Sequence, residues 1–242
     1  MATTKINGIV LAENNMGDYD KMLTMLTPNF GKISCAAKGA RRPKSSLLAG
    51  TQMFCFGEYL MYKGTNTFHI NSCETIEMFY NIRTDLDKLK YAIHINKIIM
   101  DVTEENENCF NIMQLLLNTL YTISETNKDL DLVLSIFKMR LLTILGFKPR
   151  ILSCTNCKEK EKIKYFSIKD NGFKCEICGK QDKSSIEISK STKNAIKYVV
   201  TSPPKKLYSY NLKDEALKEF KLISNIYFNQ KMEKEYKIED IF

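Results

Sequence analysis

The sequence predicts an α+β protein with two domains, an N-terminal five-stranded β-barrel and a C-terminal helical domain that carries a four-cysteine insert. Stretches rich in β-branched and aromatic residues alternate with turn signals up to about residue 80, after which apolar residues recur at helical spacing. Two C-x-x-C pairs, separated by 17 residues, follow past the middle of the chain. We therefore expect domains at 1–80 and 81–242, with the insert at about 150–183.

Five short strands are expected in the first domain, and turn signals such as Thr27-Pro28-Asn29-Phe30-Gly31 separate them. A domain of this size with five strands typically closes into a barrel, and the OB-fold is the common barrel of that kind. Most of its aromatic residues should fill the barrel, although some could stack on nucleic-acid bases. The aromatic residues concerned are Tyr19, Phe30, Phe54, Phe56, Tyr59, Tyr62 and Phe68. The expected strands cover residues 5–12, 19–26, 33–37, 53–62 and 67–73.

Helices are expected on both sides of the cysteine insert, with Gly146 and Pro149 ending the helix before it and Ser189 capping the helix after it. We expect these flanking helices to pack together, so that the insert is a long excursion from one helical domain. The expected helices cover about 86–100, 110–120, 130–145, 189–200 and 212–229.

The two cysteine pairs have the spacing of a zinc site with four thiolate ligands. The linker is long enough for a β-hairpin, and Asn171-Gly172 supplies its turn. Gly179 follows the second pair, where a positive φ is often needed. Because four cysteines leave zinc no open coordination position, the expected cofactor is one structural Zn²⁺ per chain. The expected ligands are Cys154, Cys157, Cys175 and Cys178.

Eight cysteines without an N-terminal signal sequence favour a reducing cytoplasm over a disulfide-bonded protein. We expect the thiols outside the insert to be buried as small apolar side chains. No apolar run approaches the roughly 18 residues of a membrane span. The net charge of +8 arises mainly after residue 148 and suggests an acidic partner, although a lysine-rich solvated surface would look the same. The thiols outside the insert are Cys35, Cys55, Cys73 and Cys109.

A dense basic cluster follows the third expected strand, in a loop at the barrel mouth where OB-folds usually bind nucleic acid. Four cations lie within seven residues, beside a glycine that permits close approach of the backbone. Guanidinium and ammonium groups suit phosphate oxygens, so we favour phosphate binding over a merely solvated loop. The residues expected to bind DNA are Lys38, Arg41, Arg42 and Lys44.

Catalytic motifs are missing from the sequence. Lys44-Ser45 lacks the glycine frame of a phosphate-binding P-loop, and the two histidines, His69 and His94, are more typical of ordinary strand and helix residues. Acidic pairs such as Asp85/Asp87 lie near expected helix starts, where the helix dipole favours them without any catalytic role. We expect no enzymatic activity.

These features together resemble the RecO family of bacterial DNA repair proteins, which are recombination mediators. The resemblance covers nearly the whole chain and becomes weaker after about residue 185. Some members lack the cysteines, so the chain resembles the zinc-containing branch. In the expected turn before the second strand, Met16-Gly17-Asp18 keeps the glycine and the acid of the family pattern but loses its aromatic residue. The run 38–45 is the most family-specific match. The other matching runs are 8–11, 18–28, 31–34, 140–142 and 145–149.

The resemblance implies binding to single- and double-stranded DNA, annealing of complementary strands, and loading of RecA onto DNA covered by single-strand-binding protein. It also implies RecR and RecF as partners, a helical pocket for the acidic, apolar C-terminal tail of single-strand-binding protein, and a cytoplasmic, nucleoid-associated location. Two alternatives stay open: a zinc-ribbon adaptor that binds only protein, and a nuclease or nucleotidyl transferase with a zinc ribbon.

Overall fold

The computed structural model describes residues 3–65 and 67–241. The chain divides into two compact units. The first contains the chain up to Ser124 together with Ile241, and the second is Glu125–Asp240.

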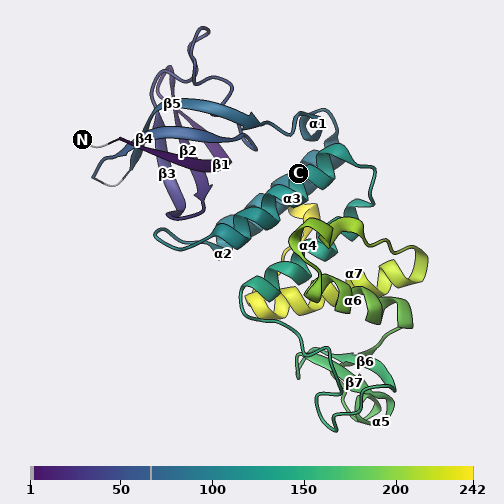
Figure 1. Cartoon of the computed structure of the whole chain (residues 1–242). Helices are drawn as coiled ribbons and strands as arrows, with labels where there is room; N and C mark the ends of the chain where they lie inside the picture. Colours follow the sequence, from purple (N-terminus) through teal and green to yellow (C-terminus); the bar gives the residue numbers. More distant parts are fainter. Residues whose placement is uncertain (1–2, 66, 242) are drawn as a thin grey trace. The chain divides into compact units, whose positions relative to one another are not determined.

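Five strands of the first unit form a closed barrel in the order β1-β2-β3-β5-β4, as Figure 1 shows in purple and blue. The strands β3 and β5 pair in parallel and all other neighbours are antiparallel, which is the OB-fold arrangement. The predicted fold class is therefore confirmed. The strands are β1 (Thr3–Met16), β2 (Asp20–Thr27), β3 (Gly31–Ala37), β4 (Phe56–Lys63) and β5 (Phe68–Glu77).

Buried and exposed residues alternate along the strands, and the buried side chains fill the barrel. Leu23, Met25, Ile33 and Tyr59 are buried in this core, as expected for a barrel too small to enclose a channel. The end predicted for the first strand is too early: β1 continues to Met16 because its last residues pair with the start of β2. The turn between them is therefore confined to residues 17–19.

Helices α2 (Leu86–Val102) and α3 (Phe110–Glu125) follow the short α1 (Tyr80–Arg83). The side-chain amide of Asn96 in α2 donates a hydrogen bond to the Leu11 carbonyl in β1 (2.8 Å). The ammonium group of Lys32 in β3 donates to the carbonyl of Met100, one turn further along α2 (2.6 Å). These contacts place α2 and α3 up to Ser124 in the same compact unit as the barrel, whereas the expected boundary followed residue 80, where strands give way to helices.

Gly31 allows the loop after α2 to lie against the barrel. Its φ is +65°, and a Cβ there would lie 2.0 Å from the carbonyl oxygen of Glu104. The neighbouring Lys32 N–H donates to that oxygen (2.9 Å). No L side chain fits this position without moving the backbone of the loop.

We expect Gly31→Ala to lower the free energy of unfolding of this unit by more than about 2 kcal/mol. The cost of a left-handed conformation for alanine adds to the cost of a clash between its Cβ and the backbone of Glu104. Gly17→Ala is the matched control, since Gly17 also has a positive φ (+55°) but a Cβ added there would meet no heavy atom within 4 Å. Urea unfolding measures both variants. Equal losses would show that the contact with Glu104 does not limit this position.

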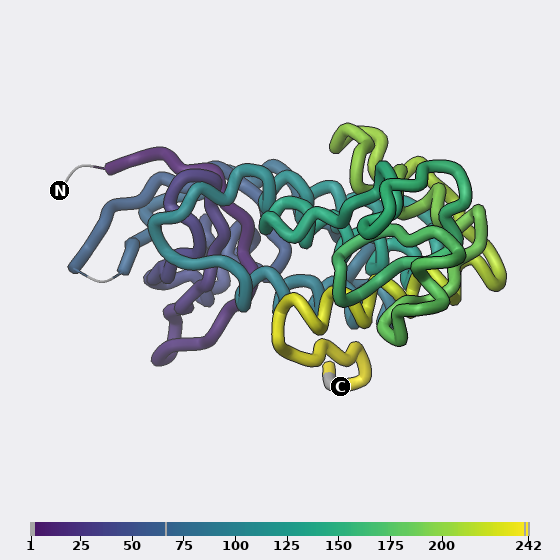
Figure 2. Tube along the Cα trace, turned by 90° about the horizontal axis from the view of Figure 1, so that it is seen from below, coloured from purple at the N-terminus to yellow at the C-terminus, as the bar shows by residue number. Residues whose placement is uncertain are grey.

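The second unit contains the helices on both sides of the insert. Helix α4 (Leu130–Ile144) packs against α6 (Lys190–Thr201) and α7 (Asp214–Met232), which confirms that the flanking helices meet. Figure 2 shows α4 and α7 close together although they lie far apart in the sequence. Short 3-10 turns, η1 (Pro204–Ser209) and η2 (Ile238–Ile241), follow α6 and α7.

The run Arg140-Leu141-Leu142 has a structural explanation in this unit. The guanidinium of Arg140 donates to the carbonyls of Val199 and Val200 at the end of α6 (3.1 and 3.2 Å). Gly146, at φ +92°, ends α4 as expected. The run therefore holds two helices together across the insert.

The cysteine insert folds as a three-stranded sheet in the order β7-β6-β8 with one short helix, α5 (Glu176–Lys180). It extends beyond the expected end at 183, because β8 adds a third strand beside β6. Among the described residues, no helix is both long and apolar enough to cross a membrane. The strands are β6 (Ile163–Ser167), β7 (Gly172–Cys175) and β8 (Ser185–Glu187).

Candidate metal centre and nucleic-acid interface

The four predicted cysteine ligands come together in the second unit. Their sulfur atoms all lie within 4.8 Å of one another, and Cys157 and Cys175 are 3.5 Å apart. Zinc held tetrahedrally at about 2.3 Å from each sulfur separates the sulfurs by about 3.8 Å. The quartet, Cys154, Cys157, Cys175 and Cys178, therefore fits a metal ion of that size.

A hairpin turn and a set of backbone hydrogen bonds bring the two cysteine pairs together. The hairpin turn lies at Asn171 (φ +55°), as the sequence predicts, and brings β7 and Cys175 back beside β6. The first pair closes through backbone hydrogen bonds, with the Cys154 N–H donating to Glu159 and the Lys158 N–H donating to Cys154. The side-chain amide of Asn156 donates to the sulfur of Cys178 (3.5 Å), a contact that the spacing did not reveal.

The expectation for Gly179 is wrong. The left-handed residue after a cysteine pair is Lys158 (φ +67°), whereas Gly179 lies in helix α5. A Cβ at Gly179 would lie 2.3 Å from the ring of Tyr165 in β6. Glycine is required there because the helix packs directly against an aromatic ring.

The neighbouring backbone and sulfur groups change how readily these thiols ionise. Burial opposes ionisation of Cys154, but backbone N–H groups from Cys175 and Cys157 outweigh it and lower the pKa of its thiol to about 6. At Cys157 the Glu159 N–H favours the thiolate, yet the neighbouring sulfurs of Cys175 and Cys154 raise the pKa to about 12. Several thiolates this close need a cation to coexist, which is the situation that a divalent metal satisfies.

The insert also has a polar centre of its own. The carboxylate of Asp182 accepts hydrogen bonds from Lys174 (2.7 Å), Ser167 (2.6 Å) and Ser184 (2.7 Å). Burial works against the charge of Asp182, but these donors hold its pKa well below the usual range. The strands β6 and β7 are thus tied to the loop after α5 independently of the cysteines.

The predicted basic loop lies beside the β1–β2 turn of the first unit. Ala40 and Leu47 insert into the barrel core and fix the loop between β3 and β4. The Gly39 N–H donates to the Asp20 carboxylate (2.7 Å), and the Arg41 N–H donates to the Tyr19 carbonyl (2.9 Å). The loop therefore has a defined conformation with its charged side chains outside.

All four predicted cations of this loop are exposed. The side chain of Arg41 donates to the Gly17 carbonyl (3.2 Å), and the guanidinium of Arg42 lies over the Tyr19 ring, 5.5 Å from its centroid. Within the described part of the chain, no carboxylate forms an ion pair with any of the four. Their charges are therefore open to an anionic ligand. The four are Lys38, Arg41, Arg42 and Lys44.

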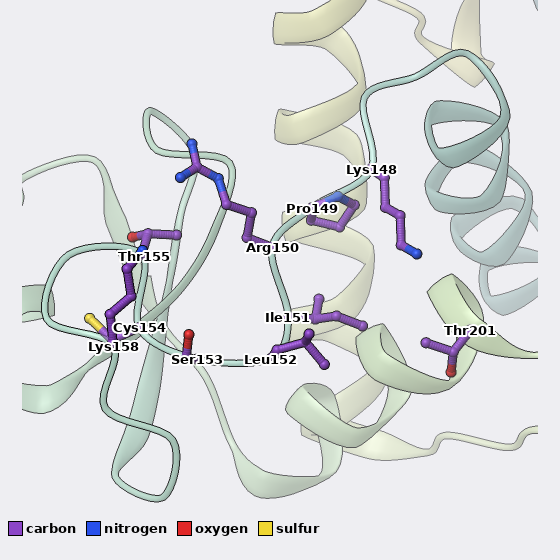
Figure 3. A pocket seen from close by; sticks show the side chains of 10 residues that line it. All are labelled: Lys148, Pro149, Arg150, Ile151, Leu152, Ser153, Cys154, Thr155, Lys158 and Thr201. Atoms are coloured by element: carbon purple, nitrogen blue, oxygen red, sulfur yellow. The ribbon is translucent and has the colours of Figure 1, made fainter.

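A cavity of about 390 Å³ lies in the second unit beside the first cysteine pair. Figure 3 shows the segment 148–155 running past it, with Ile151 and Leu152 directed toward the helix of Thr201. The side chain of Leu152 is 83% exposed. The lining thus combines apolar side chains with the cations Lys148, Arg150 and Lys158, a combination that the sequence did not predict.

Two acidic residues near helix starts accept hydrogen bonds from backbone N–H groups. Asp85 accepts hydrogen bonds from the N–H groups of Asp87 and Lys88 at the start of α2. Asp129 accepts one from Leu132 at the start of α4. These carboxylates are used as helix caps.

The chain combines an OB-fold barrel with helices that carry a four-cysteine element. This combination is the one that the resemblance to the RecO family predicts. The family description "Recombination protein O N terminal" matches residues 1–79, and "Recombination protein O C terminal" matches residues 83–238. The chain belongs to this family, which places it among proteins of DNA repair and recombination.

Curated relatives agree in name and in length. A protein of Acetivibrio thermocellus named DNA repair protein RecO is 40% identical over 233 residues, covering 96% of this chain and 93% of the relative. The protein of the same name from Bacillus subtilis is 31% identical, covering 94% and 89%. That of Thermoanaerobacter is 30% identical, covering 99% and 97%.

Proposed function

We propose that this protein is a non-catalytic recombination mediator that binds single- and double-stranded DNA and anneals complementary strands. The observation that carries the proposal is the basic loop, whose four exposed cations have no carboxylate partner among the described residues. Cations that neutralise phosphates remove much of the repulsion between two strands. Pairing then proceeds without any covalent chemistry, in keeping with a site that consists of cations alone.

The metal has a structural part in this proposal. One Zn²⁺ bound by the cysteine quartet would hold the insert together, and four sulfur ligands leave it no position for a substrate. Bound zinc supplies folding energy. The DNA-binding loop belongs to the other compact unit, so we assign DNA binding and metal binding to separate parts of the chain.

The family suggests the partners. We propose that the protein loads RecA onto DNA covered by single-strand-binding protein, together with RecR and RecF, at the nucleoid. The cavity beside the first cysteine pair suits the acidic, apolar tail of single-strand-binding protein: its cations complement carboxylates, and the exposed Leu152 offers an apolar surface. Such a contact would bring the mediator to covered strands.

Strand annealing tests the proposed function directly. Two complementary oligonucleotides, one labelled with a donor dye and one with an acceptor, are mixed with and without single-strand-binding protein. We expect the protein to accelerate pairing in both cases. Lys148→Glu with Arg150→Glu should lose acceleration only on covered strands, because a charge reversal at the cavity repels an acidic tail and leaves the basic loop intact.

Each result of this assay has a distinct meaning. Pairing that is no faster than the spontaneous rate would contradict the mediator proposal and favour an adaptor that binds only protein. Loss of the labelled strands in magnesium would indicate a DNA-processing enzyme. Equal acceleration of covered strands by the wild type and the cavity variant would remove the cavity from the proposal.

A further inference from the structure

The aromatic residues of the barrel differ in exposure, and Phe30, Phe56 and Tyr62 are partly buried. Tyr59 and Phe54 are fully buried, and Phe68 is nearly so. Tyr62 is occupied by a stacking contact with His69, with ring centroids 4.9 Å apart and an interplanar angle of 15°. Tyr19 differs from these residues because half of its side chain is exposed.

The surroundings of Tyr19 connect it to the basic loop. Its carbonyl accepts the Arg41 N–H, and its ring lies under the guanidinium of Arg42, 5.5 Å from the ring centroid. The turn that carries it begins at Gly17, whose carbonyl accepts a hydrogen bond from the side chain of Arg41. The ring is thus held at the edge of a group of cations by both backbone and side chain.

Nearby acidic groups do not neutralise this arrangement. The carboxylate of Asp20 accepts the Gly39 N–H. Asp18 is exposed, and in the described structure it forms no ion pair with a cation of the loop. An anionic ligand that reaches the loop therefore meets an aromatic surface beside unpaired positive charge.

We propose that Tyr19 stacks on an unpaired base of a DNA strand whose phosphates the basic loop holds, with Arg42 fixing the ring and contacting the adjacent phosphate. The proposal rests on the proposed function. Bases stack on aromatic side chains without sequence preference, whereas a paired base in a duplex presents only its edges. Tyr19 therefore gives the loop its preference for single strands, and the cations give it affinity for any strand.

The decisive comparison uses three ligands of equal length: oligo(dT), an abasic strand that keeps the phosphates, and a duplex. We expect Tyr19→Ala to weaken oligo(dT) binding by about fivefold to a hundredfold and to leave abasic and duplex binding unchanged. Tyr19→Phe should bind like the wild type, because the ring is kept. Tyr121→Ala is the matched control, since Tyr121 is an exposed tyrosine on α3.

A direct readout exists because the chain contains no tryptophan. Tyr19→Trp introduces a single tryptophan, which can be excited selectively over the tyrosines and whose emission should be quenched by oligo(dT) and not by the abasic strand. An unchanged ratio of oligo(dT) to abasic affinity in Tyr19→Ala, or equal quenching by both strands, would overturn the stacking proposal. Abasic binding that is insensitive to Arg41→Ala with Arg42→Ala would instead contradict the proposed function of the loop.

Discussion

Replacing Cys175 by serine is expected to abolish stoichiometric metal binding and to lower the stability of the cysteine insert by more than about 4 kcal/mol. The four sulfurs lie within 4.8 Å of one another. Loss of one sulfur leaves three thiols that bind metal weakly and repel one another when ionised. Since the metal-bound form is the folded form, the lost binding energy appears as lost folding energy.

The measurement combines metal content with thermal unfolding. Cys73→Ser is the matched control, because it makes the same atomic change at a half-buried cysteine of the barrel that lies outside the quartet. A chelator should reproduce the effect of Cys175→Ser on the wild-type protein. Metal release should also become easier as the pH falls, because protons compete with the metal for sulfur.

Two results would speak against a structural metal: a wild-type protein that purifies without stoichiometric zinc, or a melting curve that a chelator leaves unchanged. The Asp182 network would then be sufficient to hold β6 and β7 together. DNA affinity provides a further check. Because the basic loop belongs to the other compact unit, DNA affinity should survive in Cys175→Ser at temperatures below its melting transition.

Local patterns in the sequence predicted most of the architecture. Buried and exposed residues alternate along the strands, and apolar residues recur every three to four positions along the helices. Ser189 caps the start of α6 and Gly146 ends α4, as expected. The clustering of the four cysteines could be predicted because ligand spacing is itself a local property. The hairpin turn at Asn171 belongs to the same group of local signals.

What the sequence did not predict depends on contacts between distant residues. The requirement for Gly31 comes from the carbonyl of Glu104, and the requirement for Gly179 comes from the ring of Tyr165. Neither partner is visible from the glycine's own neighbours in the sequence. The choice of Tyr19 among the barrel aromatics likewise needed the packing of the β1–β2 turn against the basic loop.

The second large effect is expected at the basic loop. Arg41→Ala with Arg42→Ala should weaken DNA binding by about tenfold to a hundredfold at low salt, whatever the sequence of the DNA. The plot of log affinity against log salt concentration should become flatter by about 1.4 for single strands, since each neutralised phosphate contributes about 0.7. Fluorescence anisotropy with labelled oligonucleotides over a series of salt concentrations measures both quantities.

Two control variants separate the effect of lost charge in this loop from the effects of lost charge elsewhere and of lost guanidinium geometry. Lys205→Ala with Lys206→Ala removes the same charge from an exposed pair in the second unit and should leave the slope unchanged. Arg41→Lys with Arg42→Lys keeps the charge, so it should keep the slope while losing part of the affinity that comes from the guanidinium forks. If the double alanine variant keeps both the affinity and the salt slope of the wild type, phosphates are bound elsewhere. The four exposed cations between Lys38 and Lys44 would then be only a solvated loop.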